Sequence, residues 1–367
     1  MSDPLVQFEQ FGVTGPRGAP ALADFDLSLA RGETVSLLGP PGAGKTLALH
    51  AVAGLARASA GRLFIAGRHQ AETPPHQRNI ALVERDPALF PAMTVAQNIA
   101  FPLRLRRVGR GDRVRRVTQL LTEFELAGKA ALRPAALEAR DALRVALARA
   151  LSFRPTALLL DDPLPPLEHG EREPLIAEIR GLLRRFNASV LHATRDPREA
   201  FAMGDRIAVM DGGRLLQVGL PRAVYDEPVS ARVAQLTGEA NTLRGMVLGR
   251  DGNECEVRLD GGPVVGARAV DCGPAGSPCV VTVRPERVAV AAMQASELGE
   301  DAHAARLVEA VHQGDHIRLR VALGAGSEIV SRRPATGAPL PQIGGPAAVA
   351  WSWSQALAFR AGDGAAA

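Results

Sequence analysis

The residues Gly39-Pro40-Pro41-Gly42-Ala43-Gly44-Lys45-Thr46 have the types and the spacing of a loop that holds nucleotide phosphates. Backbone N–H groups of such a glycine-rich turn, and of the helix N-terminus that follows it, point at the phosphate oxygens. Lys45 supplies a positive charge for the terminal phosphates, and the Thr46 hydroxyl can ligate Mg²⁺. The pattern predicts a site for the magnesium complex of ATP or GTP.

The segments on either side of this loop fit the same interpretation. Residues 34–38 read as a buried strand that feeds the loop, and residues 47–56 read as the helix that follows it. The chain has only two lysines, Lys45 and Lys129, among 43 basic residues. Since nearly every other cation is arginine, a compact ammonium at Lys45 is a specific choice.

Length and charge limit the possible functions. A chain of 367 residues predicts two domains, each with its own core. A net charge of +4 with 4% aromatic residues does not favour a nucleic-acid partner. The densest basic stretch, Arg104 to Arg116, contains seven arginines and no interleaved aromatics. It is either a solvated helical face or a contact for an acidic partner or the inner membrane leaflet.

Targeting signals and cysteine patterns are also informative. The start of the chain lacks a signal-peptide pattern, and no apolar run reaches the roughly 18 residues of a membrane span, so a cytoplasmic location is expected. Cys255, Cys272 and Cys279 match neither a disulfide framework nor a zinc site.

The pattern of the sequence changes at about residue 237. Up to that point, apolar strand-like runs alternate with helical segments, which indicates a parallel α/β sheet covered by helices. Residues 157–160 and 188–193 read as two of its strands, and residues 176–186 as a helix between them. The first domain is predicted to span residues 1–237.

Residues 238–367 are predicted to form a separate all-β domain, a pair of small barrels. Short alternating runs at 242–248 and 255–259 are separated by a turn, and the run 317–323 alternates apolar residues with arginines. Trp351 and Trp353 are expected to share one strand face, either in the core or as a ligand platform.

Several further segments carry a family resemblance. These are Ala88–Val95 with Asn98–Phe101, Leu158–Leu164, Thr194–Asp196 and Val283–Glu286. Together with the phosphate loop, they resemble the ATP-binding subunit of an ABC import system that carries a C-terminal transport-associated OB-like (TOBE) domain. The resemblance implies a P-loop ABC ATPase domain with a helical subdomain, followed by a smaller all-β OB-like domain.

The resemblance also implies ligands and partners. ATP and Mg²⁺ would be bound by the loop, with Thr46 and Asp161 facing the metal. A second ATP-binding subunit would complete a homodimer or heterodimer at the inner face of the cell membrane. Two membrane permease subunits would dock on the segment around residues 88–101. Through these subunits, the chain would work with a periplasmic binding protein.

Yet the family's hydrolytic positions depart from its pattern. The Q-loop glutamine falls on Arg85, the catalytic glutamate on Asp162 and the switch histidine on Arg195. The LSGGQ signature reads Leu-Glu-Ala-Arg-Asp at residues 137–141, and the D-loop reads Pro-Pro-Leu-Glu at residues 165–168. These three residues and two segments are the ones that the resemblance assigns to catalysis or closure.

The substitutions have predictable physical effects. The Asp162 carboxylate is still a base, but it is withdrawn by about 1.5 Å, and a misplacement near 1 Å costs on the order of 100-fold in rate. Arg85 and Arg195 place two permanent cations where, with Lys45, they can clamp the γ-phosphate. Acidic side chains in the signature, Glu138 and Asp141, oppose a phosphate there. Binding is expected to persist while turnover falls.

Two other site residues remain open at this stage. His192 could replace the missing switch histidine or be a buried core histidine. Phe11, shortly before the first core strand, is the candidate ring for stacking on adenine, with ordinary core packing as the alternative.

Three functional hypotheses follow. The chain is an ATP-hydrolysing motor subunit of an importer, a nucleotide-binding structural or regulatory subunit that hydrolyses little, or a decayed copy. Residues 238–241 and 314–319 resemble the polyamine (spermidine/putrescine) branch of such subunits. Related branches that import ferric iron, sugars or phosphonates share the architecture.

Overall fold

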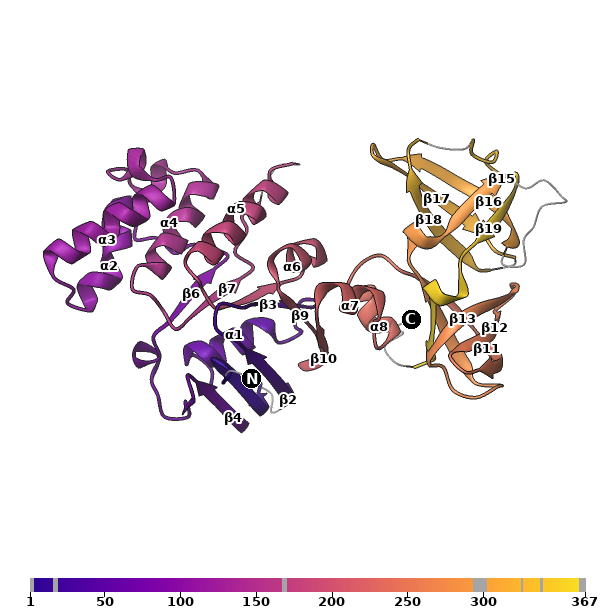
Figure 1. Ribbon diagram of the computed structural model, residues 1–367, viewed down its shortest axis with the longest axis horizontal. Coiled ribbons are helices and arrows are strands. Elements are labelled where there is room, and N and C mark those ends of the chain that lie inside the picture. Colours follow the sequence, from indigo (N-terminus) through magenta and orange to yellow (C-terminus); the bar gives the residue numbers. More distant parts are fainter. Residues whose placement is uncertain are drawn as a thin grey trace. The chain divides into compact units, whose positions relative to one another are not determined.

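The computed structural model describes residues 3–15, 19–166, 170–292, 302–324, 326–336 and 339–362. It divides into two compact units, residues 1–224 and 225–367 (Figure 1). The division falls before the position expected from the sequence, residue 237, because the helix at 231–236 packs on a strand of the second unit.

The first unit is built on a six-stranded sheet in the order β10-β9-β3-β8-β7-β6. Neighbouring strands are parallel except for β9 and β10. Every residue of β3 and β8 is buried, as expected for a parallel sheet covered on both faces. The strands are β3 (Thr34–Leu38), β6 (Ile80–Glu84), β7 (Ala157–Asp161), β8 (Val190–Thr194), β9 (Arg206–Asp211) and β10 (Arg214–Gly219).

A second, antiparallel sheet of this unit has the order β2-β1-β4-β5. Its buried residues form one apolar cluster with β3 and with the helix that follows the phosphate loop. That helix is therefore fixed from two sides. The strands are β1 (Val6–Thr14), β2 (Pro20–Leu29), β4 (Ala60–Ile65) and β5 (Arg68–His69).

Six α-helices of the described residues 3–220 belong to the first unit, and α2, α3 and α4 pack together as a helical subdomain (Figure 1). Thr94 and Gln97 form a reciprocal capping box that starts α2. The helices are α1 (Lys45–Ala53), α2 (Val95–Leu105), α3 (Arg110–Glu123), α4 (Ala139–Leu151), α5 (Arg172–Arg185) and α6 (Pro197–Met203).

Sequence and structure agree on these elements, apart from their ends. The helix predicted at 47–56 is α1, which starts at Lys45 and ends early because Gly54 adopts a left-handed conformation with φ of 84°. The helix predicted at 176–186 is α5, and the strand predicted at 188–193 is β8. None of the described helices is long and apolar enough to cross a bilayer.

The basic stretch Arg104 to Arg116 covers the end of α2 and the first half of α3. Several of its guanidinium groups are exposed, but Arg116 is half-buried and donates to the carbonyl oxygens of Leu151 (2.9 Å) and Ser152 (3.2 Å). Arg116 therefore satisfies carbonyls that the C-terminus of α4 leaves open.

Two short helices, α7 (Pro221–Asp226) and α8 (Ala231–Leu236), connect to the β-rich part of the chain. This part contains one closed five-stranded barrel and one five-stranded sheet, so the predicted pair of barrels is wrong in its second member. The barrel is formed by β11 (Asn241–Asp251), β12 (Glu254–Leu259), β13 (Val264–Asp271), β14 (Pro278–Val283) and β20 (Ala356–Arg360). The sheet is formed by β15 (Ala289–Ala292), β16 (Ala302–His312), β17 (His316–Ala322), β18 (Glu328–Pro334) and β19 (Pro346–Ala350).

Five short 3₁₀ helices complete the described elements: η1 (Pro75–Gln77), η2 (Ala127–Lys129), η3 (Pro134–Ala136), η4 (Pro285–Arg287) and η5 (Trp353–Gln355). The last of these corrects the expectation for the two tryptophans. Trp351 is buried in the core, whereas Trp353 lies half-buried in η5, so the two do not share a strand.

The three cysteines are buried as free thiols among the residues that fill the second unit. Burial raises the pKa of the Cys255 thiol to about 12 and that of Cys279 to about 11. The Cys255 and Cys279 thiols therefore stay protonated at neutral pH, and these two residues behave as small apolar side chains.

Arg284 is the main polar anchor of the second unit. The residue is 5% exposed, and its guanidinium donates to the carbonyl oxygens of Ala234 (2.8 Å) and Tyr225 (3.2 Å) and to the Thr237 hydroxyl (2.8 Å). It also lies over the Tyr225 ring, 4.0 Å from the ring centroid. One side chain thus ties the connecting segment to the barrel.

We expect Arg284→Ala to destabilise the second unit by about 3 kcal/mol, because buried acceptors lose their donor. The chain's two tryptophans, Trp351 and Trp353, both lie in this unit, so tryptophan fluorescence follows its thermal unfolding alone. Arg318→Ala is the control, since its accessible ion pair with Glu239 is worth less than about 1 kcal/mol. Equal losses from the two variants would contradict the anchoring role.

Candidate functional site

The loop Gly39–Thr46 joins the end of β3 to the start of α1, as expected from the sequence. Its shape requires glycine at two positions in particular. A Cβ at Gly39 would lie 2.2 Å from the Met210 carbonyl oxygen, and one at Gly44 would lie 2.7 Å from Leu22 Cδ2. The loop therefore packs directly on β9 and β2, at positions where only glycine fits.

Lys45 and Thr46 both line the cavity over the loop. Lys45 Nζ donates to the carbonyl oxygens of Gly39 (2.6 Å) and Pro40 (2.9 Å), which holds the ammonium across the loop. Burial lowers the pKa of Lys45, while the nearby carboxylates of Asp161 and Asp162 partly oppose this shift. A phosphate arriving here meets a partly desolvated cation, which strengthens the attraction.

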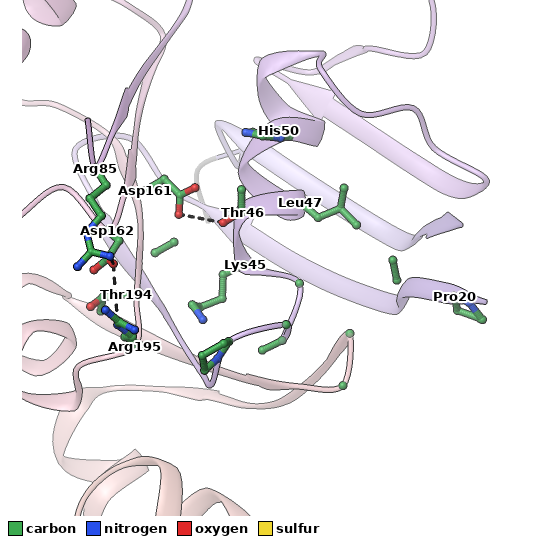
Figure 2. Close-up of a pocket in the computed structure, with 18 residues that line it drawn as sticks. Pro20, Lys45, Thr46, Leu47, His50, Arg85, Asp161, Asp162, Thr194 and Arg195 are labelled. Carbon is green, nitrogen blue, oxygen red and sulfur yellow. Dashed lines mark hydrogen bonds and ion pairs between the residues drawn. The ribbon is translucent and has the colours of Figure 1, made fainter. Parts of the chain in front are cut away.

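The two residues predicted to face the metal lie together. The Thr46 hydroxyl donates to Asp161 Oδ1 at 3.1 Å (Figure 2). Mg²⁺ prefers oxygen ligands and is usually completed by water and substrate phosphates, so this hydroxyl–carboxylate pair fits it. Within the described part of the chain, no group of three or more His, Cys, Asp or Glu side chains is arranged to hold a metal on its own.

Asp162 lies between the two unexpected arginines. Its Oδ2 is 3.7 Å from Arg85 Nη1 and 4.0 Å from Arg195 Nε (Figure 2). Its backbone has a φ of 48°, in the left-handed region, and its N–H donates to the Ala193 carbonyl oxygen at 2.8 Å. The structure thus brings together all three residues that the sequence assigned to hydrolysis, as one carboxylate between two cations.

A cavity of about 710 Å³ lies over the loop, large enough for a nucleotide. Arg85, Asp162 and Arg195 gather on one side of Lys45 in Figure 2, and Pro20 on the other. Sequence reasoning missed several lining residues. Leu47 and His50 follow Thr46 in α1, and the others come from strands and turns remote from the loop in sequence: Pro20, Ala21, Ala193, Thr194, Gly212 and Gly213.

The proposed adenine-stacking role of Phe11 is wrong. Phe11 is 2% exposed and packs edge-to-face on Phe8, with ring centroids 5.2 Å apart. A register shift in β1 between Phe8 and Phe11, with Gln10 at a φ of 45°, turns both rings towards the core. Phe11 therefore offers no free ring face to a base.

His192 is a buried core histidine, one of the two alternatives expected from the sequence, and not a replacement for the switch histidine. It is fully buried, with Nδ1 3.1 Å from Ser36 Oγ and Nε2 2.9 Å from Glu199 Oε1. Burial alone would raise the pKa of Glu199, but hydrogen bonds with His192 and Thr194 and the charge of Arg172 outweigh it, so that this pKa lies below its usual value. His192 is thus held in the core and does not line the cavity.

The signature segment starts α4 with a set of internal ion pairs. Asp141 is buried and pairs with Lys129 and, at 3.6 Å, with Arg144. Glu178 of α5 pairs with Arg140 and, at 2.6 Å, with Arg144. The first turn of α4 is therefore charged and already occupied by partners from this chain.

The D-loop segment is only partly described. Pro165 and Pro166 belong to the described residues, whereas Leu167 and Glu168 lie outside them.

A phosphate loop between a buried parallel strand and a helix defines a P-loop nucleotide-binding domain, here followed by a β-rich unit. The ABC transporter family profile matches residues 22–165, and the TOBE domain profile matches residues 281–359. Both profiles agree with the resemblance found from the motifs.

Curated relatives extend over most of the chain. A spermidine/putrescine import ATP-binding protein of Trichodesmium erythraeum is 33% identical, over 93% of this chain and 91% of the relative. The equivalent protein of Methylococcus capsulatus is 38% identical, over 84% and 80%. An Fe(3+) ions import ATP-binding protein of Streptomyces coelicolor is 43% identical over 64% of this chain and 67% of the relative.

The chain therefore belongs to the family of ATP-binding proteins of ABC import systems. Among solved structures, cbiO1 of Clostridium perfringens, part of an ABC transporter complex, covers 62% of this chain and 92% of its own with a TM-score of 0.57. At 24% identity this match supports the fold.

Gly44→Ala should destabilise the first unit more than Gly42→Ala. Both glycines have positive φ, 93° and 81°, so each alanine costs about 1–2 kcal/mol in backbone strain. Only Gly44 has a neighbour, Leu22, inside the radius of a new Cβ, whereas Gly42 faces open space. Thermal unfolding without nucleotide measures the difference, and a smaller loss for Gly44→Ala would contradict the tight packing of the loop.

Proposed function

We propose that this chain is the Mg·ATP-binding subunit of an import complex that couples ATP binding, with slow hydrolysis, to solute uptake. It works with a second ATP-binding subunit on two membrane permease subunits fed by a periplasmic binding protein. The phosphate loop and Lys45 bind the triphosphate, and Thr46 and Asp161 orient the metal. It acts at the inner face of the cell membrane.

The position of Asp162 between Arg85 and Arg195 is the main observation in support of slow turnover. A general base must present a free carboxylate to the attacking water. Asp162 instead faces two guanidinium groups at 3.7 and 4.0 Å, and its side chain is one methylene shorter than glutamate. Because both contacts are long and partly exposed, the arginines remain available to the γ-phosphate. Tight binding and weak base catalysis are both consistent with this geometry.

The start of α4 also supports slow turnover, because it should weaken closure of the dimer over ATP. A helix N-terminus attracts anions when its N–H groups are open. Here the exposed Glu138 occupies the cap position, so one carboxylate stands where the partner subunit's γ-phosphate would approach, whereas Asp141 in the first turn is buried and paired with Lys129. Closure over ATP should be weaker than with serine and glycine at these positions.

Polyamines are the proposed cargo. Two relatives that align with more than four fifths of the chain are named for spermidine/putrescine import. The relative named for Fe(3+) import has higher identity over a shorter stretch, so ferric iron is the competing cargo.

Restoring the family's residues should restore hydrolysis. We expect Arg85→Gln, Asp162→Glu and Arg195→His, combined with Glu138→Ser, Ala139→Gly, Arg140→Gly and Asp141→Gln, to raise Mg·ATP-dependent phosphate release at least about 10-fold. The reason is that a longer carboxylate is freed from two cations and the closing helix loses its acidic side chains. Phosphate release by the purified full-length protein is the measurement.

Arg198→His is the matched control, since Arg198 is exposed and does not line the cavity. Two results together would refute slow hydrolysis. The first is that Asp162→Asn lowers the rate of phosphate release about 100-fold below wild type, and the second is that the restored variant has the same rate as wild type. A wild-type rate that neither Asp162→Asn nor Lys45→Ala alters would favour the alternative, a structural or regulatory subunit without turnover.

Uptake assays separate the two cargos. In cells lacking this chain, wild-type protein should restore uptake of labelled spermidine, and Lys45→Ala should fail because the triphosphate loses its cation. Ferric iron uptake, measured in parallel, should not change. Recovery of iron uptake with no effect on spermidine would overturn the polyamine assignment.

A further inference from the structure

Another cavity lies in the helical subdomain, where α2, α3 and α4 pack together (Figure 1). It has a volume of about 400 Å³ and is bordered by the end of α2, one side of α3 and the turn after α4. None of its lining residues also lines the cavity over the phosphate loop. We call it the α3 hollow. Its lining is partly apolar, with Leu103, Val108 and Phe153, and partly basic, with Arg106, Arg115, Arg116 and Arg154.

The α3 hollow carries an excess of positive charge. Asp112 is the single acidic residue among its described lining residues, and it is already paired with Arg115 in the same helix. Burial and the charge of Arg154 both lower the pKa of Arg116, and the charge of Glu123 opposes this shift only in part. The cations of the hollow therefore outnumber its carboxylates, which favours an anionic ligand.

The fold gives a structural task to one of these arginines and leaves two others available. Arg116 donates to two carbonyl oxygens at the C-terminus of α4, at 2.9 and 3.2 Å, so that helix end needs no further cation. Arg106 lies over the Phe153 ring, 4.1 Å from the ring centroid. Neither Arg106 nor Arg154 has a side-chain hydrogen bond or an ion pair with any residue that the structure describes. Both are exposed, so their guanidinium groups can meet a ligand.

An exposed leucine adjoins these free cations. Leu105, next in sequence to Arg106, is 69% exposed, more than any other large hydrophobic residue that the structure describes. A single exposed leucine is common on protein surfaces. Beside a cluster of available arginines, it is typical of a surface that lies against a membrane, where the apolar side chain enters the lipid and the cations meet the headgroups.

The polar groups of the hollow favour a lipid over an acidic peptide. A peptide backbone needs a partner for each N–H and C=O group that it buries. The carbonyl oxygen of Ser152 and the side-chain oxygen of Gln119 both accept already from Arg116. An acyl chain has no such requirement, because the apolar residues of the hollow offer it hydrocarbon contacts alone.

We propose that the α3 hollow binds an anionic phospholipid of the inner membrane leaflet, with its phosphate held by Arg106 and Arg154 and its acyl carbons against the apolar residues. Such a site decides between the alternatives for the basic stretch Arg104 to Arg116, and it rests on the proposed location at the inner face of the cell membrane. Because the hollow shares no lining residue with the nucleotide site, Lys45→Ala should weaken triphosphate binding and leave lipid binding unchanged.

Co-sedimentation of the full-length protein with lipid vesicles tests this site. The vesicles contain either phosphatidylcholine alone or equal parts of phosphatidylcholine and phosphatidylglycerol, at physiological ionic strength. We expect at least about 10-fold stronger partitioning onto the anionic vesicles, since arginines near an anionic surface are attracted to it. Equal partitioning onto both kinds of vesicle would overturn the lipid site and leave the proposed function standing.

Paired variants locate the lipid. Arg106→Gln combined with Arg154→Gln should weaken partitioning onto the anionic vesicles about 10-fold, because the two cations that hold the phosphate are lost. Arg104→Gln combined with Arg110→Gln is the matched control, since it removes the same charge from exposed residues of the basic stretch that do not line the hollow. We expect the control to lose less than about 3-fold. Equal losses from the two pairs would indicate diffuse attraction and overturn the site.

Competition experiments on the wild-type protein separate the lipid from other anions. Dihexanoyl phosphatidylglycerol, a soluble form of the same lipid, should displace the protein from the anionic vesicles. Inorganic phosphate and polyglutamate at equal charge should not. Equal displacement by phosphate would overturn the role of the acyl chain, and displacement by polyglutamate alone would indicate an acidic protein partner and overturn the lipid assignment.

Discussion

The close approach of the phosphate loop to its neighbouring strands is the constraint on which the rest of the site depends. Gly39 lies against the Met210 carbonyl and Gly44 against Leu22, with no space for a side chain. Because β9 and β2 belong to different sheets, the loop fixes the position of α1 between them. Lys45 and Thr46 at the start of that helix then point towards the carboxylates that end β7.

The charged groups of the site favour phosphate binding over the activation of water. Cations and backbone amides converge on the phosphates, whereas the residue that should activate water is held between two guanidiniums. The rest of the lining is mostly small or aliphatic, with His50 and Thr194 as polar members. A site of this kind retains the recognition of phosphates, which needs only positive charge, and it weakens the activation of water, which needs a free carboxylate. Phosphate binding and water activation therefore depend on separate residues.

Local patterns were predictable from the sequence, and contacts between remote segments were not. The loop 39–46, strand β3 and helix α1 follow from short-range spacing, because each depends on neighbouring residues. Phe11 could not be placed correctly, since a single extra residue at Gln10 reverses the side of the strand that it faces. The same holds for the pairing of Lys129 with Asp141, which joins segments separated by a turn and a 3₁₀ helix.

The scarcity of lysine has a practical consequence. With only Lys45 and Lys129 in the sequence, one ammonium sits in the phosphate loop and the other is paired at the start of α4. Any amine-directed acylating reagent therefore modifies just two side chains of this protein, one in the phosphate loop and one in η2 that pairs with Asp141 of the signature segment. Mass spectrometric footprinting of these two amines would report the accessibility of the phosphate loop and of the Lys129–Asp141 pair separately.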